Sequence, residues 1–410
     1  MEVGWAAGLA ASFLVSWTAA AYCYWYVRWL PKGAPRLLAS IPVFATYSIL
    51  PLVFSRETHI LGVALNFCIF TWMGSFKVLL LCWDRGPACD PWVLASFLRF
   101  AVVMSFPAHI RREGRVVKKH VPVGSPWLHR LMKAETWSML IVRSVLKLML
   151  LVALCLRALP FRDALPQIAI YALYTILLYL FVTIVLETFA AIANSLFGII
   201  VEPHFDNPLA AASLEEFWAR RWNLLVSNSL REVVYQPVLA ALKDRTRKHV
   251  LKTSEEQPGN HSRATNDALK QSLHRRSSNG VERSFPEGRH GLEKEEQNYG
   301  VAKFWAMLAT FFASGIAHEL AVYYLTLQVT GEMTAFFTLH GLATGLEAAW
   351  SSYAPKTRPP KIICRFLTLG FCFITACWLF WPPVARGADL EVIAEMQSFI
   401  QLFQFKFVSG

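Results

Sequence analysis

The sequence has few charged residues: Asp, Glu, Lys and Arg together make up only 17% of its 410 positions. Hydrophobic residues account for 55%, and the mean hydropathy is +0.38. A water-soluble protein of this length needs more charge to cover its surface, so the excess apolar surface is expected to face lipid. The scarcity of charge excludes an ordinary soluble protein and predicts an all-α, polytopic membrane protein.

Several motifs of familiar chemistry are also missing. The eight cysteines form no C-x-x-C pair, and the H-E-x-x-H pattern begun by His318 has Val322 at its fifth position. There is no G-x-S-x-G elbow, no phosphate loop, and no histidine with Asp four residues later. We therefore expect no metal site and no cofactor. The lack of a repeat between the two halves counts against a transporter.

The 40 Lys and Arg residues outnumber the 28 Asp and Glu residues, which gives a formal net charge of +12. The basic residues lie in short connectors between apolar stretches, where they act as orientation signals rather than as a nucleic-acid surface. If the N-terminus is lumenal, the connectors at 28–36, 111–133 and 356–365 are cytosolic. We therefore expect membrane lipid, and no nucleic acid, around this chain.

Apolar stretches long enough to cross a hydrocarbon core of roughly 30 Å indicate the membrane spans. The first is too long and too aromatic for a signal peptide, so we expect it to stay in the protein. Two further stretches, 92–107 and 188–201, are short; we expect 92–107 not to cross and 188–201 to end a long helix. The predicted spans are 3–27, 37–54, 59–83, 137–156, 165–186, 301–329, 334–353 and 362–381.

Residues 254–298 lose the apolar period and mix both charge signs with Ser, Asn and Gly. This composition is typical of a solvated, disordered segment, here a cytosolic loop within a single membrane domain of residues 1–410.

A capping box, S-x-x-E, predicts that a helix begins at Ser213. Continued helical spacing places Glu216, Arg220 and Asn223 on one face, beside an apolar stripe that contains Trp218 and Trp222. The alternative is an interfacial anchor, with Asn223 merely facing water.

A histidine and a glutamate, His318 and Glu319, lie inside an otherwise apolar span. Ionisable groups in a membrane interior are disfavoured by several kcal/mol, so this pair predicts a site. His318 is fourteen residues beyond Phe304, roughly 21 Å along a helix and past the bilayer midpoint. Ser314 and Gly315 share its face and allow a close approach by a helix or a substrate. The alternative is a packing seam with a hydrogen-bonded histidine.

His340 and Glu187 also interrupt apolar stretches. Each could line the same cavity or could be a satisfied structural group.

Four segments together resemble plant wax synthases and related sterol acyltransferases of the membrane-bound O-acyltransferase family, and they keep the order found there. They are TWMGSFKVLLLCWDRGP (71–87), EFWARRWNLLVSNSLREVVYQPVL (216–239), FFASGIAHEL (311–320) and FFTLHG (336–341). Glu232 departs from the pattern, because many relatives have Pro after the L-R pair. The segment 254–298 resembles an insertion.

The resemblance implies a bundle of about eight to nine spans around a central reaction tunnel, in the endoplasmic reticulum membrane. Acyl-CoA enters from the cytosol as a co-substrate, and a lipophilic alcohol arrives from the bilayer. By motif position, the catalytic pair is Asn223 and His318. The expected substrate-binding residues are Trp218, Arg220, Arg221, Trp222, Ser314, Glu319 and His340.

The expected reaction moves a fatty acyl group to a long-chain alcohol and forms a wax ester. His318 acts as general base, Asn223 supplies a hydrogen bond, and Arg220 and Arg221 are candidates for the coenzyme A phosphates. A sterol, another terpenoid alcohol or diacylglycerol remains open as the acceptor, as do the oligomeric state and, from another class, transport.

Overall fold

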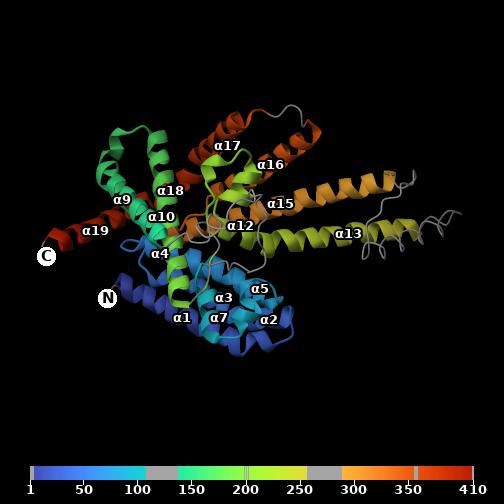
Figure 1. Ribbon diagram of the computed structural model, residues 1–410, viewed down its shortest axis with the longest axis horizontal. Coiled ribbons are helices and arrows are strands. Elements are labelled where there is room, and N and C mark those ends of the chain that lie inside the picture. The colour runs from blue at the N-terminus through green and yellow to red at the C-terminus, as the bar shows by residue number, and fades with distance from the viewer. Residues whose placement is uncertain are drawn as a thin grey trace, which may run out of the picture. The chain divides into compact units, whose positions relative to one another are not determined.

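The structure is a computed structural model that describes residues 4–107, 137–197, 199, 201, 203–255, 289–354 and 359–408. In these ranges every regular element is a helix and no β-strand forms (Figure 1), which confirms the predicted all-α class. Contacts within the chain divide it into two compact units, one of Met1–Val233 with Phe311–Gly410 and one of Val234–Thr310. The first unit holds the candidate site.

The N-terminal part of the first unit consists of many short helices around the longer α1. Helix α7 packs against α1, and their contact forms the centre of the largest buried apolar cluster. The elements are α1 (Trp5–Trp25), η1 (Val27–Trp29), α2 (Ala34–Ala39), α3 (Ile41–Ile49), η2 (Leu50–Val53), α4 (Ile60–Asn66), η3 (Phe67–Gly74), α5 (Ser75–Cys82), η4 (Pro87–Cys89), α6 (Pro91–Leu94) and α7 (Phe97–Ser105).

The predicted span at 37–54 is not one helix. Helix α2 ends at Ala39, and only Ile41–Val53 forms a short apolar helical stretch. Pro42 and Pro51 lack the amide hydrogen that would continue the backbone hydrogen bonds, and they are the second residues of α3 and η2. Thirteen residues reach about 20 Å, too little to cross a hydrocarbon core of about 30 Å unaided.

The segment 92–107 forms the short helices α6 and α7. Nine residues of α7 reach about 14 Å, so the segment does not cross as a single helix, in agreement with the prediction. Its carboxyl end is held by Lys77 of α5, whose buried ammonium donates to the carbonyls of Val103, at 2.7 Å, and Phe106. A cation at a helix carboxyl end satisfies carbonyls that have no partner within the helix.

Helices α9 (Trp137–Arg157) and α10 (Gln167–Phe197) pack against each other across η5 (Leu159–Ala164) (Figure 1). Helix α10 continues to Phe197, which confirms that the apolar stretch after 188 extends the preceding helix. Glu187 on α10 accepts from Ser144 at 2.9 Å and pairs with Lys147, both on α9. Of its two predicted roles, the satisfied structural group is the one that this geometry supports.

The remaining helices of the first unit include those that carry the candidate site. Helix α19 was not predicted; its Glu395 accepts from the Trp5 indole at 2.6 Å and from the Leu61 amide at 2.8 Å. The elements are η6 (Pro208–Ala210), α11 (Leu214–Glu216), η7 (Phe217–Arg221), α12 (Leu224–Leu230), η8 (Arg231–Tyr235), α16 (Glu332–Tyr353), α17 (Lys361–Thr375), η11 (Ala376–Phe380), α18 (Trp381–Gly387) and α19 (Asp389–Val408).

The second unit contains α13 (Gln236–Glu255) and the first part of α15 (Arg289–Thr326), which continues into the first unit. Most of the predicted disordered loop, residues 256–288, lies outside the described residues, as does the basic connector 111–133. At the ends of that loop, residues 254–255 belong to α13 and residues 289–298 to α15.

Within the described ranges, five helical stretches are long and apolar enough to cross a membrane: Trp5–Trp29, Ile60–Cys82, Gln167–Phe197, Tyr299–Thr326 and Lys361–Gly387. Each overlaps a predicted span, and together they make the chain an integral membrane protein. Helices α9 and α16 have 21 and 22 residues but fall outside this set. The count of eight to nine spans stays a prediction.

Candidate active site

His318 is half-buried on α15, and its ring is held by a single hydrogen bond to the backbone. Its Nδ1 lies 2.8 Å from the carbonyl oxygen of Ser314, one turn earlier. Because a carbonyl can only accept, Nδ1 carries the hydrogen, and in the neutral ring Nε2 keeps its lone pair. Nε2 has no hydrogen-bond partner within the described residues. The histidine therefore presents a free acceptor, as a general base must.

Aromatic rings from three other elements enclose the His318 ring. Phe337 of α16 stacks on it at 4.1 Å between centroids, and Trp72 of η3 meets it edge to face at 4.8 Å. Phe380 of η11 lies at 6.4 Å. Such packing restricts the imidazole to one orientation, so that Nε2 faces a fixed position.

The small residues before His318 form a helix-packing seam. A side chain added at Gly315 would meet the backbone of Thr334 at 2.8 Å, so α16 crosses α15 at this glycine. Ser314 is buried beside it and contributes its carbonyl to His318. The predicted close approach is thus made by a helix, and substrate binding by Ser314 stays a prediction.

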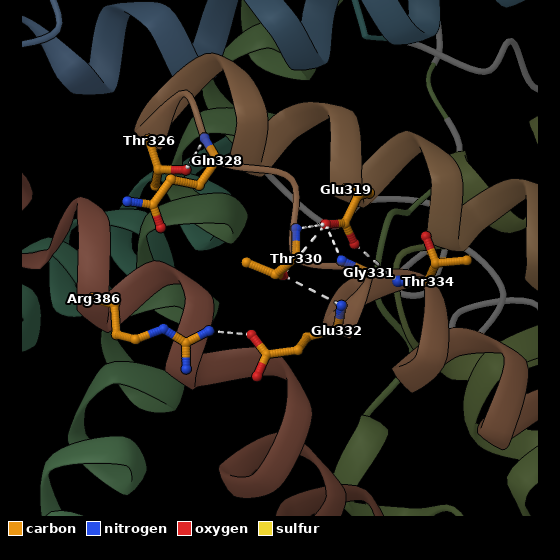
Figure 2. Close-up of polar contacts among 8 residues, drawn as sticks. All are labelled: Glu319, Thr326, Gln328, Thr330, Gly331, Glu332, Thr334 and Arg386. Atoms are coloured by element: carbon orange, nitrogen blue, oxygen red, sulfur yellow. Dashed lines mark hydrogen bonds and ion pairs between the residues drawn. The ribbon is translucent and has the colours of Figure 1, made fainter.

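Glu319 is buried and holds the turn between α15 and α16 (Figure 2). Its carboxylate accepts from the amides of Thr330 and Gly331, both at 2.7 Å, and from that of Thr334 at 3.2 Å. The Thr330 hydroxyl adds a fourth contact at 3.3 Å. These donors belong to the start of α16, so Glu319 caps that helix and supports the His318 segment.

His340 is fully buried and uses both of its ring nitrogens. The Trp218 indole donates to Nδ1 at 3.0 Å, and Nε2 donates to the Thr375 hydroxyl at 2.8 Å. No lone pair is left to accept a proton from a substrate. Of the two predicted roles, this geometry supports the satisfied structural group, which joins η7, α16 and α17 and positions Trp218.

The helix that begins at Ser213 starts as predicted. The Ser213 hydroxyl accepts from the Glu216 amide at 3.0 Å, and the Glu216 carboxylate accepts from the Ala212 amide at 2.8 Å. The prediction that this helix continues through Asn223 is wrong, because the backbone of Trp222 is extended and Asn223 has a φ of +41°. Glu216, Arg220 and Asn223 therefore do not share one helical face.

Asn223 lies at the break between η7 and α12. Asparagine tolerates the left-handed conformation better than most residues, and its Oδ1 accepts from the Val226 amide at 3.4 Å. The segment before η6 stabilises this break between the helices, because the Leu224 amide donates to the His204 carbonyl at 2.7 Å. The Asn223 Nδ2 group has no partner among the described residues. The break thus offers an amide donor.

The two arginines of this segment differ in their availability. Arg221 binds Glu216 through Nε at 2.9 Å and the Asp206 carbonyl through Nη1 at 2.9 Å, so it locks the loop. Arg220 forms an exposed pair with Glu215 at 2.9 Å. Exposed pairs contribute little free energy, so only Arg220 is readily free to exchange its partner for a phosphate.

The two tryptophans of this segment point to different neighbours. Trp218 packs against Phe337, at 5.6 Å, which in turn stacks on His318. Trp222 stacks on Phe217 at 5.5 Å and meets Tyr179 of α10 at 6.0 Å. Trp218 therefore belongs to the surroundings of His318, and Trp222 stabilises the contact with α10.

One apolar cluster brings together segments that lie far apart in the sequence. Leu225 and Val226, two and three residues after Asn223, belong to the same cluster as Trp72 and Ala317, the neighbour of His318. The early, Asn223-bearing and His318-bearing segments thus meet, although sequence analysis did not select Trp72. Trp72 lies in the segment 71–87, which was identified only by its resemblance to the acyltransferase family. Within the part of the chain that the structure describes, no three His, Cys, Asp or Glu side chains gather to hold a metal ion.

Comparison with known proteins identifies a family and several relatives. The model of the "Membrane bound O-acyl transferase family" matches residues 201–254. The chain is 31% identical over 368 residues to the probable long-chain-alcohol O-fatty-acyltransferase 1 of Arabidopsis thaliana, covering 89% of this chain and 87% of that protein. It is 29% identical to the long-chain-alcohol O-fatty-acyltransferase of Simmondsia chinensis, covering 94% and 93%.

A third relative is the acyl-CoA–sterol O-acyltransferase 1 of Arabidopsis thaliana, which is 29% identical and covers 93% of this chain and 92% of its own length. These similarities extend over almost the whole chain. The chain is an acyltransferase and belongs to the membrane bound O-acyl transferase family.

Proposed function

We propose that this protein transfers a fatty acyl group from acyl-CoA to the hydroxyl of a long-chain alcohol and forms a wax ester. The observation that carries the proposal is the Nδ1 hydrogen bond of His318 to the Ser314 carbonyl, which leaves Nε2 as a free acceptor deep in a helix. An alcohol is a poor nucleophile at neutral pH and needs such a base. The relatives named for long-chain alcohols supply the acceptor class.

The chemical step is a direct transfer. Nε2 of His318 accepts the hydroxyl proton as the alcohol oxygen attacks the thioester carbonyl carbon. The tetrahedral intermediate collapses, the carbon–sulfur bond breaks, and the thiolate of coenzyme A takes the proton from the imidazolium. No acyl-enzyme and no resident cofactor are needed, because acyl-CoA is a co-substrate.

Asn223 has the second role in this proposal. Its Nδ2 group donates a hydrogen bond to the alcohol or to the developing oxyanion, and the left-handed backbone fixes its position. Arg220, on the exposed side of the same segment, exchanges Glu215 for a phosphate of coenzyme A. We place the enzyme in the endoplasmic reticulum membrane, with this segment on the cytosolic side.

A sterol is the second candidate for the acceptor, because the sterol acyltransferase relative covers as much of the chain as the wax synthases do. One assay separates the two. Detergent-purified protein is given radiolabelled palmitoyl-CoA with hexadecanol, with a plant sterol or with diacylglycerol. We expect labelled wax ester as the main product. A sterol ester in its place would change the acceptor, and no ester from any alcohol would contradict the proposed function.

A further inference from the structure

The indole of Trp72 has a buried N–H group without a partner. Trp72 is 7% exposed, and its Nε1 makes no hydrogen bond within the described residues. Other indoles are paired: that of Trp5 donates to Glu395, that of Trp218 to His340, and that of the equally buried Trp381 to Thr175 at 2.9 Å. A buried donor without an acceptor destabilises the folded protein, so its presence calls for an explanation.

The position of the Trp72 N–H group supplies an explanation. Trp72 lies in ring contact with His318, at 4.8 Å between centroids, on the π-helical turn η3. Among the five buried side-chain atoms without a partner in the described residues, it is the one whose residue contacts His318. Turns of this type are frequent at functional sites.

Trp72 also shares an apolar cluster with the segment that carries Asn223. Leu225, two residues after Asn223, belongs to the apolar cluster of Trp72, together with Leu186 of α10. The indole therefore lies among the elements that carry His318 and Asn223. A substrate oxygen bound beside His318 would therefore lie next to the residue that carries this unpaired N–H group, in apolar surroundings.

We propose that Trp72 Nε1–H donates a hydrogen bond to the thioester carbonyl oxygen of the acyl donor, an inference that rests on the proposed acyl transfer. That oxygen gains negative charge when the alcohol attacks, and a fixed donor stabilises it. An indole suits this task because it only donates and does not take up or lose a proton. Trp72 thereby becomes a catalytic residue, and its missing partner is the substrate.

The test is Trp72→Phe, with Trp381→Phe as the matched control. Both changes remove an indole N–H at a similarly buried position, but only Trp381 loses a hydrogen bond within the protein. We expect Trp72→Phe to lower kcat for wax ester formation about 100-fold, with little change in KM for palmitoyl-CoA. Trp381→Phe should lower the melting temperature and keep the specific activity.

A Trp72→Phe protein with a kcat within threefold of the wild type would overturn the inference. If that variant does not fold, benzothienylalanine at position 72 replaces the N–H with sulfur and preserves the shape, and the same two outcomes apply. Failure of the proposed function is distinct, because it would be seen in the wild type as an absence of ester from every alcohol.

Discussion

The main-chain carbonyl of Ser314 and the Nδ1 of His318 are 2.8 Å apart on consecutive turns of α15. A backbone acceptor cannot ionise and cannot rotate away, so it holds the imidazole in one tautomer. At many other sites a carboxylate accepts from the Nδ1 hydrogen of the histidine, and Glu319 directly follows His318 in the sequence. Here that carboxylate is directed to the next helix, as Figure 2 shows, and the backbone takes its place.

Glu319→Gln is expected to destabilise the protein by about 1–3 kcal/mol, because an amide in place of the carboxylate cannot accept from all of the donors at the start of α16. The matched control is Glu332→Gln in the same turn, since Glu332 only pairs with the exposed Arg386 and should contribute less than about 1 kcal/mol. Thermal unfolding of both variants in detergent measures the difference. Equal melting temperatures would contradict the capping role.

Asn223 can be tested without straining the backbone. Asn223→Gly keeps the left-handed conformation and removes only the side-chain amide, with a cost in capping of a few tenths of a kcal/mol. We expect turnover to fall by about 100-fold while the melting temperature changes little. Asn223→Asp is the companion variant, because it keeps the acceptor that caps α12 but loses the N–H donor. Normal turnover in both variants would remove Asn223 from the reaction.

His340→Ala should act on stability. It leaves the Trp218 indole without its acceptor and opens a cavity in a fully buried position, which together cost about 2–5 kcal/mol. The measurement is folded yield and melting temperature, followed by specific activity of the monodisperse fraction. We expect the surviving protein to keep its activity within about tenfold, which is small beside a lost general base. A fully stable but inactive variant would give His340 a catalytic role.

His204 predicts a pH dependence of stability. Burial lowers the pKa of His204 below its ordinary value, against the opposing effects of the Pro107 carbonyl and Glu187. The unfolded chain therefore binds more protons at this residue, and stability falls as the pH drops from about 6.5 through the lower folded-state pKa. His204→Gln should flatten this part of a plot of melting temperature against pH. An unchanged slope between pH 7 and 5 would show that another group is responsible.

Much of the architecture could be predicted from the sequence, for reasons that are local. The apolar stretches predicted the all-α class, and the S-x-x-E pattern predicted the helix start at Ser213. Because ionisable groups are rare in a membrane interior, His318 was predicted as a site residue. Gly315 marked the seam with α16 because only a very small residue permits that approach.

The remainder depends on contacts between distant segments. The break at Asn223 is closed by the pairing of Leu224 with His204, so a helical period that continued through Asn223 could not reveal it. The turn held by Glu319 lies eleven to fifteen residues away, beyond any helical spacing. Trp72 carries no sequence signal of its own, and only the structure shows its indole in ring contact with His318.

The most direct test is the specific activity of His318→Ala, measured as labelled ester formed per mole of detergent-purified, monodisperse protein. General base catalysis contributes about 10²- to 10⁴-fold, so we expect a loss of at least that order, with normal insertion and normal binding of palmitoyl-CoA. A structural role would instead lower yield and melting temperature together and leave specific activity intact. A well-folded His318→Ala protein that makes ester at a near-normal rate would contradict the account.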